Sequence, residues 1–168
     1  MRQRGFSAVE MMAVVVIIAT LAALAGPSVS AFIADGRLRG AAMDLLTDLY
    51  YARSEAVRLN MPVTVTSVSG TDWASGWTVR CAGTPDPCKN GAPPLRQRVA
   101  YPGIQIAANT ATFSYSIDGR LDSLAPTFIV QPLSTAVAQW VRNRCVSIDI
   151  SGRPSIVVDK DGNRTNGC

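Results

Sequence analysis

The chain has 168 residues, of which 48% are apolar and 17% are charged, with a net charge of +4 and a mean hydropathy of +0.17. The apolar excess is concentrated near the N-terminus, because no charged residue occurs from Met11 to Ala34. Histidine is absent, which excludes Ser-His-Asp triads, Cys-His dyads and His-ligated metal sites. We therefore expect one domain with an apolar N-terminal segment and no enzyme, metal site or cofactor. Arginine supplies 14 of the 16 basic residues, which permits binding to a polyanion without showing it.

The N-terminal segment allows three interpretations. Arg2 and Arg4 precede an apolar run of about 20 residues, which is long enough to cross a bilayer as a helix that starts in the cytoplasm. The run could belong to an ordinary secretory signal peptide, since Ala23–Ala25 looks like a small-x-small cleavage site. It could also be a plain single-span anchor. The third interpretation depends on Glu10, whose charge is costly at the edge of an apolar segment and therefore suggests a function.

The order Arg4, Gly5, Phe6 and then Glu10 resembles the class III signal of type IV prepilins and pseudopilins. The resemblance implies that residues 1–5 are a leader, that a prepilin peptidase cuts between Gly5 and Phe6, and that Phe6 is N-methylated. Pro27 matches the helix-kinking proline that is common in this family. Glu10 would then pair with the new amino group of Phe6, on its own chain or a neighbour, because opposite charges attract strongly at low dielectric. The alternative for Glu10 is an interfacial carboxylate solvated by lipid headgroups.

A second stretch of helix follows Pro27. Its apolar positions recur with alternating spacings of three and four, which is typical of an amphipathic helix: Leu38, Ala42, Leu45, Leu49, Ala52, Ala56 and Leu59. The charged residues of this stretch, Asp48 and Glu55 among them, fall on other faces. Asn60–Pro62 ends the helix. We expect helix from about Phe6 to Leu59, interrupted only near Gly26–Pro27. A two-stranded coiled coil is a weaker alternative, because the repeat is short and rich in alanine.

The remainder of the chain shows short β-type runs broken by Gly, Pro, Asn and Asp, as expected for an antiparallel sheet. The expected strands are Val63–Val68, Gly76–Cys81, Leu95–Tyr101, Ala111–Ser116, Thr127–Gln131, Trp140–Ile150 and Ser155–Asp159. Trp73, Trp77 and Trp140 are interpreted as core or sheet-packing residues, with base stacking as a minor alternative.

Cys81, Cys88, Cys145 and Cys168 allow three disulfide pairings. Disulfides are expected because the N-terminal segment would export the domain into an oxidising compartment. Short-range pairing joins Cys81 to Cys88 and Cys145 to Cys168. A four-cysteine zinc site is the alternative, but no CxxC pair is present.

The chain resembles the GspH/FimT family of minor pilins and pseudopilins. The matching stretches are RGFSAVEMMAVVVIIATLAALAGPSVSAFIADGRLRGAAMDLL, YYARSEAVRLNMPVTV, GWTVRC, FSYSIDGRL and CVSIDISGRPS. The expected fold is α+β and pilin-like: a long N-terminal α-helix with a hydrophobic transmembrane first half, packed on an antiparallel β-sheet C-terminal domain. The expected segments are a leader (1–5), a transmembrane and filament-core helix (6–33), an amphipathic helix (34–60) and a β-rich head (61–168).

The resemblance implies a low-abundance subunit that primes assembly near the tip of a type IV pilus. An H-type pseudopilin of a type II secretion system is the alternative. The stretch PSVSAFIADGRLRGAA resembles the pilus branch of the family more closely than the secretion branch. The implied partners are other minor and major pilins, the prepilin peptidase and the bacterial inner membrane. The implied location is a single-pass inner-membrane protein with a cytoplasmic N-terminus, found after assembly in the periplasm or the extracellular pilus.

Some members of the FimT branch bind DNA in natural transformation through a C-terminal motif that resembles Gly-Arg-x-Arg. Here Gly152 and Arg153 match that motif, but Ser155 replaces its second arginine. Further candidate contacts to double-stranded DNA are Arg142, Arg144, Lys160 and Arg164. If these groups converge, they would grip phosphates without sequence readout and with strong salt dependence. The alternative is a solvated surface with weak local ion pairs.

Overall fold

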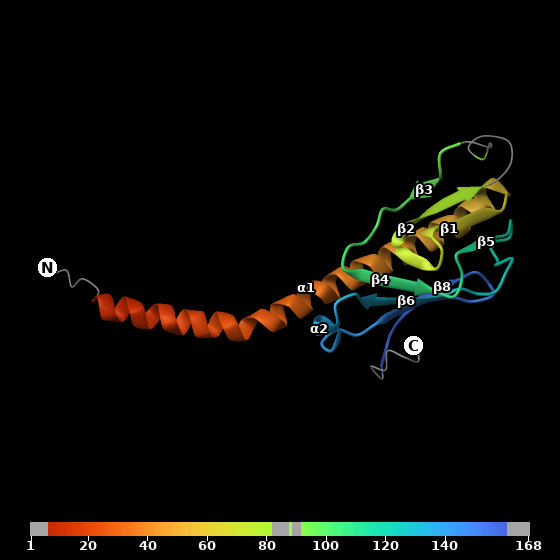
Figure 1. The fold of residues 1–168 in the computed structure, drawn as a ribbon. Helices are drawn as coiled ribbons and strands as arrows, with labels where there is room; N and C mark the ends of the chain where they lie inside the picture. Colours follow the sequence, from red (N-terminus) through yellow and green to blue (C-terminus); the bar gives the residue numbers. More distant parts are fainter. Residues whose placement is uncertain (1–6, 82–87, 89–91, 161–168) are drawn as a thin grey trace, which may run out of the picture.

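The computed structural model describes residues 7–81, residue 88 and residues 92–160. A single helix, α1 (Ala8–Leu59), begins at the N-terminus and runs for 52 residues. Its first half extends away from the rest of the chain, and its second half lies against a β-sheet (Figure 1). The expected interruption near Gly26–Pro27 is not a break in the helix, which is continuous through residues 24–27. A proline within a helix removes one hydrogen bond and can bend the helix without ending it.

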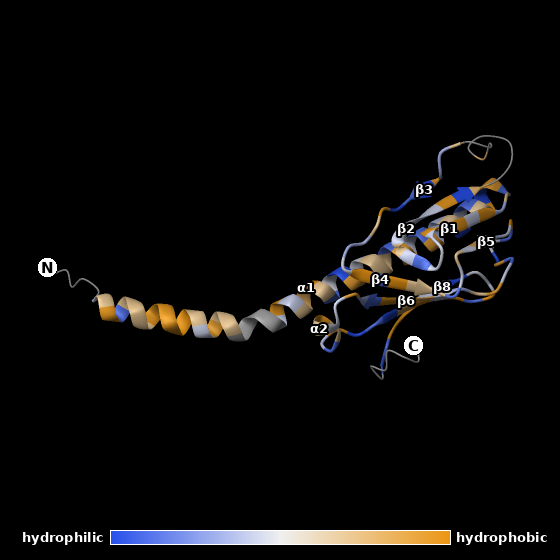
Figure 2. Cartoon of the chain, in the orientation of Figure 1, coloured by the Kyte–Doolittle hydropathy of each residue, from blue (hydrophilic) through white to orange (hydrophobic). Residues whose placement is uncertain are grey.

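The two halves of α1 have different surroundings. The first half is apolar (Figure 2), is long enough to cross a membrane, and has none of its most apolar 18-residue stretch buried. The second half buries the predicted stripe, which confirms the amphipathic helix: Leu38, Ala42, Leu45, Leu49, Ala52 and Ala56 are buried and Leu59 is half-buried. Asn60, at φ 52°, ends the helix in the left-handed conformation, two residues before Pro62.

The sheet contains eight strands. They are β1 (Val63–Ser69), β2 (Asp72–Cys81), β3 (Arg96–Gln97), β4 (Ile104–Ala108), β5 (Thr112–Tyr115), β6 (Thr127–Pro132), β7 (Arg144–Ile148) and β8 (Pro154–Val158). Their order is β5-β1-β2-β4-β6-β7-β8, with β3 paired to β2 off this path, and the strand pairs are antiparallel. A one-turn helix, α2 (Thr135–Ala138), lies between β6 and β7. The predicted fold class is confirmed.

The core lies between α1 and the sheet. Trp73 and Trp77 are fully buried, as predicted. The indole N–H of Trp73 donates to the carbonyl of Thr110 at 2.8 Å, and the ring packs edge-on against Phe128 with centroids 4.9 Å apart. The prediction for Trp140 is wrong, because its side chain is 66% exposed in the turn that follows α2.

Three predictions about strands are wrong in part. Only Arg96 and Gln97 of the strand expected at Leu95–Tyr101 pair with β2, and residues 95–101 form a strap along the edge of β2. The backbone N–H groups of Arg98 and Tyr101 fasten this strap to β2 carbonyls, each at 2.8 Å. The strand expected at Trp140–Ile150 is confined to β7, and no strand was expected at β4. The other predicted strands are present with shifted ends.

Candidate functional site

The assembly residues predicted from the sequence fall at the free end of α1. Glu10 lies in the first helical turn, is exposed, and donates its backbone N–H to the carbonyl of Ser7 at 3.1 Å. Gly5 and Phe6, the expected cleavage and methylation residues, lie outside the described residues. Pro27 lies within α1, 17 residues beyond Glu10. Glu10 is therefore the one acidic side chain described on an otherwise apolar helix half.

The second half of α1 is held to the head by a buried carboxylate. Asp48 was expected on a face of the helix other than the apolar stripe, and its side chain is fully buried. It accepts hydrogen bonds from the indole of Trp77 at 3.0 Å and from two guanidinium groups of the strap, Arg96 and Arg98, at 2.7 Å each. Its hydrogen bond raises the pKa of Arg98. One helix residue therefore fixes both β2 and the strap.

Aromatic side chains complete this contact. Tyr101 stacks on Trp77 with ring centroids 5.5 Å apart, and its hydroxyl donates to Asp44 at 2.9 Å. Burial, and then the hydrogen bond to Asp44, raise the pKa of Tyr101. The guanidinium of Arg96 lies 4.1 Å from the ring centroid of Tyr51 on α1. The strap is therefore attached to the helix by charge and by ring contacts together.

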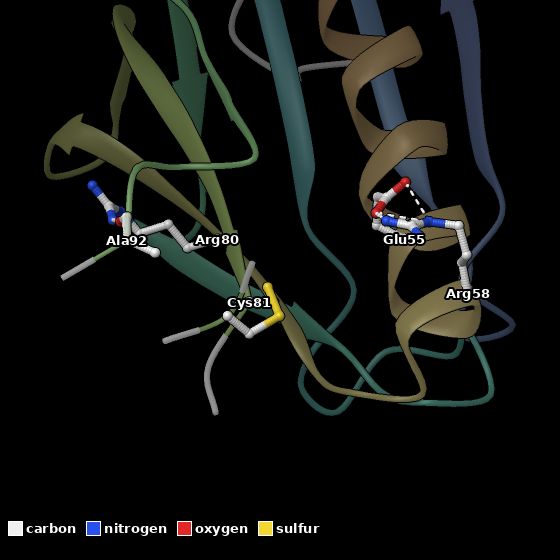
Figure 3. The surroundings of a disulfide bond; sticks show 6 residues. Glu55, Arg58, Arg80, Cys81 and Ala92 are labelled. Atoms are coloured by element: carbon white, nitrogen blue, oxygen red, sulfur yellow. Dashed lines mark hydrogen bonds and ion pairs between the residues drawn. A yellow bond between two sulfur atoms is a disulfide. The ribbon is translucent and has the colours of Figure 1, made fainter. Parts of the chain in front are cut away.

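The disulfide predicted between Cys81 and Cys88 is present, with Cα atoms 5.0 Å apart (Figure 3). Next to Cys81, the guanidinium of Arg80 donates to the carbonyl of Ala92 at 3.0 Å, which holds the far end of the loop between β2 and the strap. Cys145 is buried on β7 and is not free. Its expected partner, Cys168, lies outside the described residues.

The basic residues proposed for DNA do not form one surface. Arg144 is buried, and its guanidinium donates to Asp35 of α1 at 2.7 Å. Burial acts to raise the pKa of Asp35, but the hydrogen bonds from Arg144 and Arg39 outweigh it and hold that pKa below its usual value. Arg144 is therefore committed to joining β7 to α1, which corrects its place among the candidate DNA contacts. Arg164 lies outside the described residues.

The other candidate DNA contacts lie at opposite ends of the β7–β8 hairpin. Arg142 is exposed at the open end and donates to the carbonyls of Lys160 at 2.6 Å and Asp159 at 3.2 Å. Gly152 and Arg153 lie in the turn at the closed end, where Gly152 is buried and Arg153 is exposed. The strand between these ends, from Arg144 to Ile148, spans roughly 13 Å. The exposed indole of Trp140, for which base stacking was the minor alternative, lines the same hollow as Arg142.

Comparison with known proteins identifies the family. A family model described as type II transport protein GspH matches residues 41–152. The chain belongs to the GspH family. No curated protein matches the sequence. The GspH match covers most of the head and the buried half of α1, which includes Asp48 and the β7–β8 turn.

Solved structures share the fold of this GspH-family chain. The type IV minor pilin FimU of Pseudomonas aeruginosa matches in two crystal forms, at 22% identity with TM-scores of 0.55 and 0.58. The match covers 73% and 77% of this chain and 92% of the FimU chain in both forms. The minor pseudopilin EpsH of Vibrio cholerae matches at 11% identity with a TM-score of 0.54, over 73% of this chain and 97% of EpsH. The chain therefore has the fold of FimU and EpsH.

Proposed function

We propose that this protein is a minor pilin of a type IV pilus, a structural subunit that primes assembly and lies near the pilus tip. The observation that carries the proposal is the division of α1 into an unburied apolar half with Glu10 in its first turn and a half packed on the head. FimU at 22% identity favours the pilus, and EpsH at 11% supports the alternative, an H-type pseudopilin of a type II secretion system.

In this proposal, the apolar half of α1 anchors the precursor once in the inner membrane, with its N-terminus in the cytoplasm. A prepilin peptidase cuts between Gly5 and Phe6, and the amino group of Phe6 becomes N-methylated. Glu10 then pairs with that amino group on its own chain or a neighbour, because the low dielectric strengthens the attraction. The head then lies in the periplasm, and assembly with other minor and major pilins carries it into the extracellular pilus.

The proposal predicts that Glu10→Gln lowers the amount of the protein in sheared filaments about tenfold, which corresponds to about 1.4 kcal/mol of assembly free energy. The membrane-bound amount stays unchanged, because Glu10 makes no side-chain contact with the head among the described residues. Immunoblots of the sheared and membrane fractions measure both quantities. Thr20→Ala is the matched control in the same helix half, since among the described residues the hydroxyl of Thr20 bonds to the carbonyl of Ile17 alone, at 2.8 Å.

Filament incorporation of the Glu10→Gln variant at the wild-type level would refute the role of Glu10. A strain in which this gene is deleted distinguishes the type IV pilus from the type II secretion system. Loss of pili with normal protein secretion after deletion of this gene assigns the protein to the pilus, and loss of secretion with normal pili assigns it to the pseudopilus.

DNA binding is a second candidate activity, and the exposed pair of Trp140 and Arg142 favours it. An exposed indole offers a stacking surface for bases, and a neighbouring guanidinium contacts phosphate. Lys160 is exposed beside Arg142 and adds a second cation at the open end of the β7–β8 hairpin. In this proposal the contact lies at that open end and not at Arg153.

If this is so, Arg142→Ala combined with Lys160→Ala weakens duplex DNA binding by the detergent-solubilised chain about tenfold and lowers the salt slope by about two. Arg153→Ala, at the closed end of the same hairpin, is the control and leaves the affinity unchanged. Fluorescence anisotropy with a labelled duplex at two salt concentrations measures both effects. A wild-type chain that does not bind at low salt would exclude the activity.

A further inference from the structure

Two turns far apart in the sequence have nearly the same residues and the same hydrogen bonds. Residues 116–120 read SIDGR and residues 149–153 read DISGR, with serine and aspartate exchanged. In each turn the aspartate accepts the hydroxyl of the serine and the backbone N–H of the arginine, which lies 3.1 Å from Asp118 and 3.0 Å from Asp149. Each glycine donates its N–H to the first residue of its turn, at 2.8 and 2.9 Å. We call residues 116–120 and 149–153 the twin turns.

The twin turns lie against each other. A Cβ placed on Gly152 would come within 2.0 Å of the carbonyl oxygen of Gly119 and 3.3 Å of the Cα of Arg120. The Cα atoms of Arg120 and Arg153 are therefore no more than about 9 Å apart, given standard backbone lengths. Arg53 of α1 ties the pair together, because its guanidinium donates to the carbonyls of Gly119 at 3.0 Å and Ser151 at 3.3 Å. The arrangement is a rigid platform built from three segments of the chain.

The platform presents cations and apolar side chains together. Arg120 and Arg153 are exposed, and neither guanidinium forms a hydrogen bond or ion pair within the described part of the chain. The second position of each turn holds an isoleucine, of which Ile117 is 50% exposed and Ile150 is 73% exposed. Arginine combined with exposed apolar side chains is the composition of a protein-binding surface.

The same platform is poorly suited to a nucleic acid. The hydroxyl of Ser116 and the N–H of Arg120 lower the pKa of Asp118, and Ser151 and Arg153 do the same for Asp149. Each arginine therefore has an ionised carboxylate in its own turn, which opposes the approach of phosphate. Protein–DNA interfaces are more polar and more positively charged than this surface. A face with apolar groups and a few carboxylates fits it better.

The position of the twin turns indicates which protein would bind. Arg53, which contacts both turns, lies near the end of α1 at Leu59, opposite the unburied apolar half. In Figure 1 the head lies along the second half of the helix, away from the N-terminal end. If the apolar half is in the membrane, as the proposed function states, the twin turns face away from it. We propose that the twin turns, on the membrane-distal side of this chain, bind a neighbouring subunit of the same filament. The neighbour would contribute apolar groups and carboxylates to the contact.

Site-specific photo-cross-linking in piliated cells tests this proposal. With the photo-reactive p-benzoylphenylalanine in place of Ile150, we expect an adduct with a pilin-like subunit, identified by mass spectrometry. Arg120→Glu combined with Arg153→Glu reduces the adduct about tenfold. Each exposed arginine has only its own turn's carboxylate as a nearby opposite charge in the described head, so the melting temperature falls by no more than the neutral control, Arg120→Gln combined with Arg153→Gln, and a small surface repulsion allow. The same cross-linker in place of Val99, which is 79% exposed on the strap, is the control and gives no such adduct.

The proposal is overturned if Ile150 gives no adduct with a filament subunit, if the adduct is with DNA, or if its yield survives the double charge reversal. The amount of the chain in sheared filaments is read from the same samples. If the chain is in filaments and no adduct forms, only the docking surface is wrong. If the chain is absent from filaments, the proposed function is wrong and the docking surface with it.

Discussion

Asp48→Asn should lower the free energy of unfolding by about 3 kcal/mol, because it removes the charge at the centre of a buried network. The carboxylate of Asp48 is fully buried and accepts from Trp77, Arg96 and Arg98. An asparagine keeps the shape but offers one acceptor oxygen and turns an N–H₂ group toward donors. The strap loses its main attachment to α1, and the indole of Trp77 loses a charged acceptor in the core.

Urea unfolding of the detergent-solubilised chain, followed by tryptophan fluorescence, measures this loss. Asp44→Asn is the matched control one helical turn earlier. The side chain of Asp44 is 42% exposed and lies 3.5 Å from Arg98, and the amide oxygen of an asparagine can still accept the hydroxyl of Tyr101. An exposed ion pair of this kind contributes less than about 1 kcal/mol. Equal losses for the two variants would show that burial of Asp48 does not give it a special role.

The amphipathic half of α1 was predictable because its signal is local. A stripe at spacings of three and four specifies the buried face of a helix whatever packs on it. The same periodicity placed Asp48 on a face other than the apolar stripe, since it counts only apolar residues. Its partners Arg96 and Arg98 lie 48 and 50 residues later, and no spacing rule links a helix residue to a strap at that separation. Arg144 was misjudged for the same reason, because Asp35 is 109 residues away.

Most strands of the sheet were predictable, and the errors fall between Leu95 and Ala108 and at the start of the stretch from Trp140 to Ile150. The sequence from Trp140 to Ile150 looks like one long strand. Of these residues, only those of β7 form a strand, which pairs with β6, and Trp140 lies in the turn after α2. β4 was not predicted, although Pro102–Gly103 indicates a turn before it and the alternation of Ile104 and Ile106 is typical of a strand. The strap is extended, but its arginine side chains bond to Asp48 of α1 and two of its backbone N–H groups bond to β2 carbonyls. A strand-like sequence pattern therefore does not predict a regular series of backbone hydrogen bonds there.

The twin turns carried a signal that was readable from the sequence alone. SIDGR and DISGR contain the same five residue types, with three in matching positions and the serine and aspartate exchanged, and each pattern predicts a tight turn. The sequence could not show that the two turns touch, because β5 and β7 lie at separate places in the sheet order. Contact between them depends on the curvature of the sheet around α1 and on Arg53, and those are properties of the folded chain.

Gly152→Ala should destabilise the head by at least about 3 kcal/mol, because two costs add at one position. Gly152 has φ +80°, a conformation that costs an L-residue about 1–2 kcal/mol. A Cβ would also lie 2.0 Å from the carbonyl oxygen of Gly119, which is backbone and cannot turn aside. The twin turns would have to separate, and Arg53 would lose one or both of its carbonyl acceptors.

Gly70→Ala isolates the first of these costs. Gly70 has φ +53° and nothing within 4 Å of an added Cβ, so its loss should be about 1 kcal/mol. The difference between the two urea midpoints, at an unchanged m-value, then measures the contact between the twin turns alone. Equal losses at Gly152 and Gly70 would mean that the twin turns part at little cost. In that case they could not serve as a rigid platform, since a surface that separates easily would have to be ordered again at each binding event.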